Sequence, residues 1–183
     1  LVDDASTDET VSVLKKYEEK YPDNIMLVLC KKNGRQGTAR NIGLSYATGD
    51  FISFVDSDDW IHPDMYKVLV DIMNKNECDV VQFRYMETKD KPEEMSRAID
   101  NIDYRIVDYS CNRKENLLNS QILNESCTTK LYRKSLIDCA NLRYAEGVAY
   151  EEPMFTYPMK FYVNKAAVTE TKLYYYRYNE KGT

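Results

Sequence analysis

The sequence is poor in the residue types on which several common kinds of site depend. It contains one histidine, His62, so a His-based metal cluster and a Ser-His-Asp triad are nearly excluded. Its five cysteines are odd in number, widely spaced and never form a CxxC pattern. This predicts a reduced chain without a disulfide framework or structural zinc. No apolar run approaches the roughly 18 residues of a membrane span, and no signal peptide is visible. We therefore expect a cytoplasmic protein, with any membrane attachment peripheral at the inner face.

The composition that remains is that of a globular protein. Hydrophobic residues make up 43% and charged residues 30% of the 183 residues, which is enough for one sizeable core. The net charge of −5 argues against nucleic acid as a partner, since binding to a phosphate backbone needs a basic face.

The first half alternates short apolar runs with helical patterns. Two apolar residues at the start, Leu1 and Val2, are too few for a buried strand, so we expect upstream sequence to belong to the same fold. The alternation predicts an α/β sheet with parallel strands and right-handed crossovers. The predicted strands are 25–30, 51–55 and 79–85, and the predicted helices are 10–20, with Ser6, Thr7 or Asp8 as its cap, 38–47 and 63–74.

The second half is less regular. The polar segment 87–108 indicates an insertion or a long hairpin and not a linker between domains. After it, the patterns predict helices at 114–124, 131–137 and 153–163 and a strand at 173–178.

Two of the predicted strands end in acidic residues. Asp3 and Asp4 follow Leu1-Val2, which we interpret as the end of a strand, and Asp56, Asp58 and Asp59 follow the strand 51–55. Ligands in open α/β sheets bind beyond the carboxyl ends of the strands, so both clusters should face one crevice. Closely spaced carboxylates repel one another unless a cation neutralises them, and Mg²⁺ or Mn²⁺ suits such oxygen ligands. An acidic turn that only caps the next helix is the alternative.

Between the acidic clusters, residues 33–43 combine three glycines and two arginines around the start of a helix. Backbone N–H groups at a helix start, helped by arginine, bind anions. The segment is not a Walker A loop, because GxxxxGK[ST] is absent. Phosphate binding and an ordinary helix start are equally compatible with this segment.

The order and spacing of these motifs resemble family 2 glycosyltransferases over almost the whole chain. The first strand, where the family places part of its nucleotide pocket, is missing. The matching segments are LVDDASTDET at 1–10, NG at 33–34, GTARNIG at 37–43, ATGD at 47–50, FVDSDDW at 54–60, KLYR at 130–133, EG at 146–147, YEE at 150–152 and YRY at 176–178.

The resemblance implies a GT-A-like, Rossmann-related fold, with a mixed, mostly parallel sheet flanked by helices. It implies a single, N-terminally incomplete catalytic domain, in which 1–110 binds the nucleotide sugar and 111–183 the acceptor.

The resemblance also implies roles for five residues of the first half. Asp4 would contact the nucleotide base, and Arg40 would face the same pocket. Asp56 and Asp58 would form the Asp-x-Asp motif, Asp56 contacting the nucleotide sugar. The metal, Mn²⁺ or Mg²⁺, would bind Asp58 or its neighbour Asp59.

In the second half, Glu152 occupies the position where the family usually has the aspartate that acts as catalytic base, and Glu151 is the fallback. Arg177 would help the metal to stabilise the diphosphate leaving group. Locally, Glu152 could also be only a helix cap before Pro153.

The implied reaction is transfer, with inversion, from a nucleotide-diphosphate sugar, foremost a UDP-sugar, to a hydroxyl of a carbohydrate or lipid-linked glycan in bacterial surface polysaccharide synthesis. Two rivals stay open. A nucleotidyltransferase has a related sheet and an acidic metal site, and a non-catalytic carbohydrate-binding domain would show neither metal dependence nor turnover.

Overall fold

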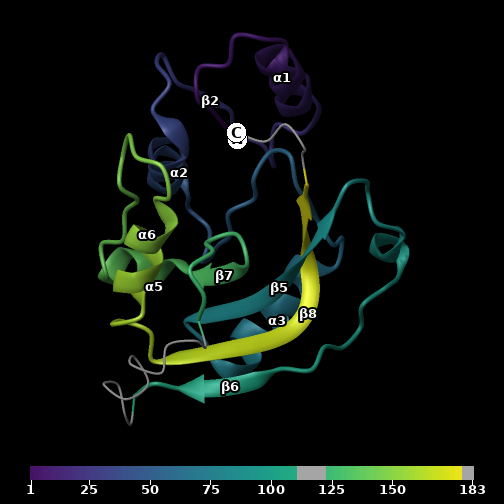
Figure 1. Ribbon diagram of the computed structural model, residues 1–183, viewed down its shortest axis with the longest axis vertical. Helices are drawn as coiled ribbons and strands as arrows, with labels where there is room; N and C mark the ends of the chain where they lie inside the picture. The colour runs from purple at the N-terminus through teal and green to yellow at the C-terminus, as the bar shows by residue number, and fades with distance from the viewer. Residues whose placement is uncertain (111–122, 179–183) are drawn as a thin grey trace. The chain divides into compact units, whose positions relative to one another are not determined.

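The computed structural model describes residues 1–110 and 123–178, which form two compact units (Figure 1). Unit 1 consists of Leu1–Thr48 and Arg143–Phe155, and unit 2 of Gly49–Leu142 and Thr156–Thr183. Nearly all of the predicted helix 114–124 lies outside the described residues. The predicted nucleotide-sugar and acceptor halves stay a prediction.

Unit 1 holds a two-stranded parallel sheet and two helices. Its elements are β1 (Val2–Asp3), α1 (Thr10–Lys20), β2 (Val28–Leu29) and α2 (Arg35–Tyr46). The bounds of α1 match the prediction, and of the three cap candidates Asp8 accepts a hydrogen bond, from the N–H of Thr10 at 3.0 Å. Helix α2 begins three residues before the predicted start, at the residue after Gly34.

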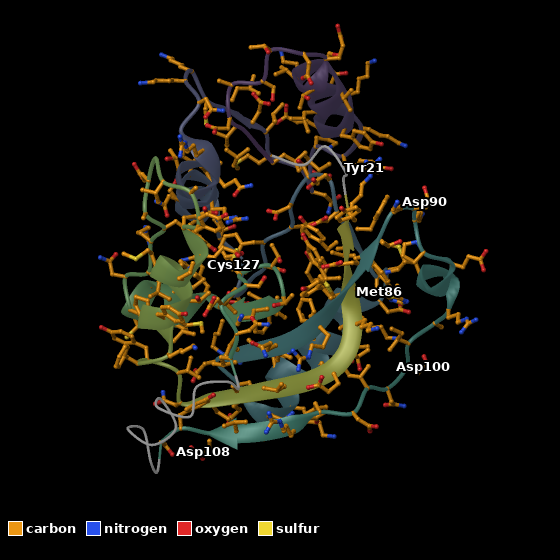
Figure 2. All side chains as sticks on the ribbon, viewed as in Figure 1. Tyr21, Met86, Asp90, Asp100, Asp108 and Cys127 are labelled. Carbon is orange, nitrogen blue, oxygen red and sulfur yellow. The ribbon has the colours of Figure 1, made fainter. Side chains whose placement is uncertain are left out.

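Unit 2 is built on a six-stranded sheet in the order β3-β7-β5-β8-β4, with β6 also paired to β8. The two longest strands, β5 and β8, run side by side and Met86 on β5 pairs with Tyr175 on β8 (Figures 1 and 2). The strand bounds are β3 Phe51–Ile52, β4 Trp60–Ile61, β5 Val80–Thr88, β6 Arg105–Asp108, β7 Lys130–Arg133 and β8 Lys165–Arg177.

The pairings are mixed, and fewer of them are parallel than the sequence pattern predicted. Only β1–β2 and β5–β8 are parallel in the described part of the chain, whereas β3–β7, β5–β7, β4–β8 and β6–β8 are antiparallel. The prediction of successive parallel neighbours was wrong because β7, a strand from the second half of the chain, pairs between β3 and β5.

Helix α3 (Met65–Asn76) covers one face of this sheet (Figure 1). Its buried residues are spaced three and four apart, the pattern of a helix with one apolar face. They pack against Val81 and Phe83 of β5 and against Leu173 of β8. The buried residues of α3 are Met65, Val68, Leu69, Ile72 and Met73.

The remaining elements correct three predictions. The segment 131–137 is not one helix, because β7 ends at Arg133 and α5 (Lys134–Cys139) begins only there. Strand β8 starts at Lys165, well before the predicted 173. Segment 87–108 contains the end of β5, a 3₁₀ turn at Glu93–Ser96 and β6, which pairs with β8 and not with β5.

Helix α6 (Glu152–Met159) begins one residue before the predicted start and ends earlier than predicted. Across 1–110 and 123–178, no helix is both long and apolar enough to cross a membrane.

Candidate active site

In unit 1, the two aspartates that end β1 are used to fix the chain around them. Asp3 is buried, and its Oδ2 accepts a hydrogen bond from the N–H of Ser6 at 3.1 Å. Asp4 is half-buried and accepts the N–H of Gly34 on Oδ1 at 2.8 Å. Asp4 therefore ties the end of β1 to the start of α2.

The start of α2 was a candidate anion site. Two of its N–H groups already have acceptors within the chain, since Gly34 donates to Asp4 and Arg35 donates to the Asn33 side chain at 3.2 Å. These two N–H groups are therefore already engaged within the chain, and whether the start of α2 binds an anion stays a prediction.

Arg40, predicted to face the nucleotide, is paired with Glu151. Its Nη1 lies 2.5 Å from Oε1 of Glu151, and the side chains are only 10% and 3% exposed. The guanidinium also lies over the ring of Tyr144, 5.4 Å from its centroid, and that ring stacks on Phe155 at 4.3 Å. The structure thus brings together two predicted site residues in one buried ion pair.

Two further residues of α2, which sequence reasoning missed, hold the loop before Glu151. Asn41 donates to the C=O of Tyr144 at 3.0 Å and accepts its N–H at 2.8 Å. Gly37 is buried against the loop, where an added Cβ would lie 2.3 Å from the carbonyl oxygen of Ala145. A glycine and an asparagine on one helix face were the only signals in the sequence, and neither identifies a partner.

Glu152 is the first residue of α6 and is half-buried, in contrast to its neighbour. Tyr150, two residues earlier, has a φ of 60° and is 91% exposed. Of the late acidic pair, Glu151 is committed to Arg40, and Glu152 is the more accessible carboxylate.

In unit 2, residues 56–59 form a turn anchored on β8. The N–H of Asp59 donates to the C=O of Asp56 at 3.2 Å and closes the turn. Both carboxylate oxygens of Asp59 are engaged by β8: Oδ2 accepts the Tyr174 hydroxyl at 2.5 Å, and Oδ1 accepts the N–H of Arg177 at 2.8 Å. The Tyr174 hydroxyl also accepts the N–H of Asp56 at 3.1 Å.

Burial changes the protonation behaviour of this pair. Burial raises the pKa of Asp59, and the hydrogen bonds from Tyr174 and Arg177 act in the opposite direction. Burial, followed by the hydrogen bond to Asp59, raises the pKa of Tyr174 far above its ordinary value, so its hydroxyl keeps the proton that it donates.

Asp58, between these anchored residues, is exposed. Within 1–110 and 123–178, no group of three or more His, Cys, Asp or Glu side chains is arranged to hold a metal ion by itself. Mg²⁺ in nucleotide sites is typically bound by one or two carboxylates, with waters and phosphates supplying the other ligands, and an exposed carboxylate on an anchored turn fits that mode.

Arg177 and Trp60 lie on paired strands next to the turn. The guanidinium carbon of Arg177 is 5.7 Å from the centroid of the Trp60 ring, a cation–π geometry. His62 is buried, with Nδ1 accepting the N–H of Asp64 at 3.1 Å and Nε2 lying 3.0 Å from the carbonyl oxygen of Arg97. The single histidine therefore has its ring nitrogens engaged by the backbone.

Comparison with known proteins gives matches over the whole chain. Residues 1–140 match the family described as Glycosyl transferase family 2. The poly(ribitol-phosphate) beta-N-acetylglucosaminyltransferase TarS of Staphylococcus aureus is 28% identical over 100% of this chain and 30% of its own length. The uncharacterized glycosyltransferase YibD of Escherichia coli is 29% identical, over 98% of this chain and 52% of its own. The chain thus spans between about a third and a half of these relatives.

Solved structures give the same result for the fold. TarS 1–349 of S. aureus in complex with UDP-GlcNAc has a TM-score of 0.75 at 25% identity, over 99% of this chain and 49% of that one. The mannosyltransferase PcManGT of Pyrobaculum calidifontis, solved with GDP-Man and Mn²⁺, has a TM-score of 0.67 at 17% identity, over 99% of this chain and 48% of that one, and is evidence for the fold alone. The predicted mixed α/β, GT-A-like class is confirmed.

Proposed function

The chain belongs to glycosyl transferase family 2, and on that premise we propose that it transfers a sugar from a UDP-sugar to a hydroxyl group of a bacterial surface polymer. The observation that carries this proposal is the turn 56–59, which is hydrogen-bonded to the end of β8 and leaves the carboxylate of Asp58 exposed. The donor class is supported by TarS, which was solved with UDP-GlcNAc. The acceptor class is supported by the name of TarS, a poly(ribitol-phosphate) glycosyltransferase.

We assign the proton transfer to Glu152. The acceptor hydroxyl gives its proton to this carboxylate while its oxygen forms a bond to the anomeric carbon of the donor. The bond between that carbon and the diphosphate oxygen breaks, and its electron pair leaves with the diphosphate. One displacement of this kind inverts the configuration at the anomeric carbon. Glu152 is the first residue of α6 and is half-buried, so its carboxylate is more accessible than that of Glu151.

The diphosphate is assigned to residues of unit 2. Asp58 would hold Mn²⁺ or Mg²⁺, and the bound cation would supply positive charge for the diphosphate as it leaves. Arg177 contributes a guanidinium on the neighbouring strand, and Asp56 contacts the nucleotide sugar. In unit 1 we retain Asp4 as the contact to the nucleotide base. We no longer assign Arg40 to the nucleotide, because its charge is already neutralised in a buried pair with Glu151. In this proposal Arg40 holds Glu151 in place.

The function is tested by offering a panel of nucleotide sugars to the full-length protein. We expect a UDP-sugar to be consumed with release of UDP, and the product linkage to be inverted when observed by NMR. Release of pyrophosphate from a nucleoside triphosphate would instead support the nucleotidyltransferase. Sugar binding without any turnover would support the carbohydrate-binding domain.

The metal is tested separately by calorimetric titration with UDP. We expect tighter binding with Mn²⁺ or Mg²⁺ than with EDTA, and loss of that enhancement in Asp58→Asn. Equal affinities in Mn²⁺ and EDTA for the unaltered protein would rule out the metal assignment.

A further inference from the structure

We propose that Tyr174 is a positioning residue for the metal-binding turn, and that Asp59 is the anchor of this turn and not a metal ligand. The inference rests on the proposed function for what the turn binds, but the anchoring itself can be measured without any ligand. It separates neighbouring aspartates that sequence alone treats alike: Asp58 binds the metal, whereas the side chain of Asp59 and the backbone N–H of Asp56 fix the turn.

The first argument is that the turn is attached at both ends to a single rigid group. The Tyr174 hydroxyl accepts the N–H of Asp56 and donates to the carboxylate of Asp59. The Tyr174 side chain is only 1% exposed and belongs to the hydrophobic core cluster that α3 forms with the sheet. The phenol ring therefore attaches an otherwise exposed turn to the hydrophobic core.

The second argument concerns the capacity of Asp59 to bind an ion. Both of its oxygens accept hydrogen bonds from β8, one from Tyr174 and one from the N–H of Arg177. A cation on this carboxylate would have to compete with these donors, and leaving partly buried donors without acceptors is costly. Asp58 is exposed and has no such bonds to give up.

The third argument is that the same bonds fix the turn relative to Arg177. The backbone of Arg177 holds Asp59, and its guanidinium lies over Trp60, the residue directly after the turn. The turn, the aromatic ring and the guanidinium are thus one connected piece of unit 2. Loss of the Tyr174 hydroxyl should loosen all three together.

Trp60 offers a test of this piece that needs no ligand, because it is the only tryptophan of the chain. In the metal-free protein, we expect Tyr174→Phe and Asp59→Asn each to raise the acrylamide quenching constant of Trp60 fluorescence. The control is Tyr132→Phe, which removes another buried phenolic hydroxyl, one that donates to the C=O of Cys127 at 3.3 Å, and should leave the quenching unchanged. Thermal unfolding monitored by circular dichroism establishes that each variant is folded.

The same variants are then titrated with UDP in Mn²⁺ and in EDTA. We expect Tyr174→Phe and Asp59→Asn to weaken binding in Mn²⁺ by about 10-fold, the worth of one charge-assisted hydrogen bond, with little change in EDTA. The double variant should lose less binding free energy than the sum of the two single losses, because the hydrogen bond between Tyr174 and Asp59 is already lost in each single variant. Asp58→Asn should abolish the Mn²⁺ effect altogether.

Four results distinguish the possibilities. Quenching and UDP affinity in Tyr174→Phe equal to those of the unaltered protein would overturn the positioning role. Loss of the entire Mn²⁺ effect in Asp59→Asn, with Tyr174→Phe unaffected, would make Asp59 the metal ligand and would also overturn the proposal. If the unaltered protein binds UDP with equal affinity in Mn²⁺ and in EDTA, the turn has no metal role and this proposal fails with it. If Trp60 quenching is unchanged in both Tyr174→Phe and Asp59→Asn, only the anchoring of the turn is contradicted.

Discussion

Glu151 and Glu152 are neighbours in sequence and lie in different environments. Glu151 is 3% exposed and bonded to Arg40, whereas Glu152 is half-buried at the first position of α6. A base must reach the hydroxyl of the acceptor, and the Glu151 carboxylate is already held in a buried ion pair 2.5 Å from the Arg40 guanidinium. We therefore propose Glu152, and not Glu151, as the base.

The first prediction follows for Glu152. Glu152→Gln should lower kcat by about 10²–10⁴-fold, the usual contribution of a general base, and leave the affinity for UDP nearly unchanged. Glu152→Asp, which keeps the carboxylate and shortens the side chain, should retain part of the activity. Steady-state kinetics with the donor identified by the panel, together with UDP titration, provide the measurement. Full activity in Glu152→Gln would assign the proton transfer to another group.

The second prediction concerns the Arg40–Glu151 pair. Arg40→Met should lower the free energy of unfolding by about 3 kcal/mol or more, because it leaves a buried carboxylate without its partner. The double variant Arg40→Met/Glu151→Gln should recover part of that loss, since it removes the uncompensated charge. Urea denaturation of the four proteins of this cycle gives the coupling. Additive losses would mean that the pair contributes no coupling to stability.

At the residue scale, the sequence indicated a cluster of neighbouring acidic residues but not the contacts between residues far apart in the chain. The acidic turn was found because three aspartates stand together after an apolar run. The pairing of Arg40 with Glu151, 111 positions away, and the clamp of Asn41 on Tyr144, 103 positions away, could not be found. Nothing local in α2 specifies which loop it will meet.

Helix α2 shows at the scale of an element how one helix carries two different glycines. Gly37 faces the loop of Arg143–Phe155 and is buried, whereas an added Cβ at Gly43 would meet only Cγ2 of Val2 at 3.6 Å, an ordinary contact. Glycine inside a helix costs up to about 1 kcal/mol relative to alanine, so each should have a compensating reason. Only Gly37 has one.

The third prediction compares the two positions. Gly37→Ala should destabilise the protein by about 1–3 kcal/mol, because its Cβ would lie 2.3 Å from a backbone oxygen and force the loop away from the helix. Gly43→Ala, in the same helix, should be neutral or stabilising by up to about 1 kcal/mol. Thermal unfolding of both variants is the measurement. A stable Gly37→Ala protein would show that the loop can move without cost.

At the same scale, periodicity predicted α1 and α3 well and β7 and β8 poorly. Both helices are amphipathic over about three turns, and the spacing of their apolar residues is visible in the local sequence. The segment 130–139 changes from strand to helix at Lys134, and no glycine or proline marks the change. The local pattern therefore predicted a single helix at 131–137. The start of β8 is fixed by its pairing with β6 and β5, which no local pattern contains.

For the molecule as a whole, buried apolar side chains are distributed unequally. Among the described residues, Tyr144 and Phe155 are the buried hydrophobic residues of unit 1, whereas unit 2 contains the entire cluster that α3 forms with the sheet. Helix α1 has no buried residue, and helix α3, of nearly equal length, has five. Segments with few buried contacts open more often than segments in the core.

The last prediction is therefore that amide hydrogen exchange will be much faster in α1 than in α3. The two helices have 11 and 12 residues, so the comparison separates packing from helix length. Exchange in β5 and β8 should be as slow as in α3, because all three depend on opening of the same core. Mass spectrometry of peptides from 10–20 and 65–76 measures this directly. Equal protection of α1 and α3 would mean that unit 1 opens only together with unit 2, and that burial within each unit does not set its local stability.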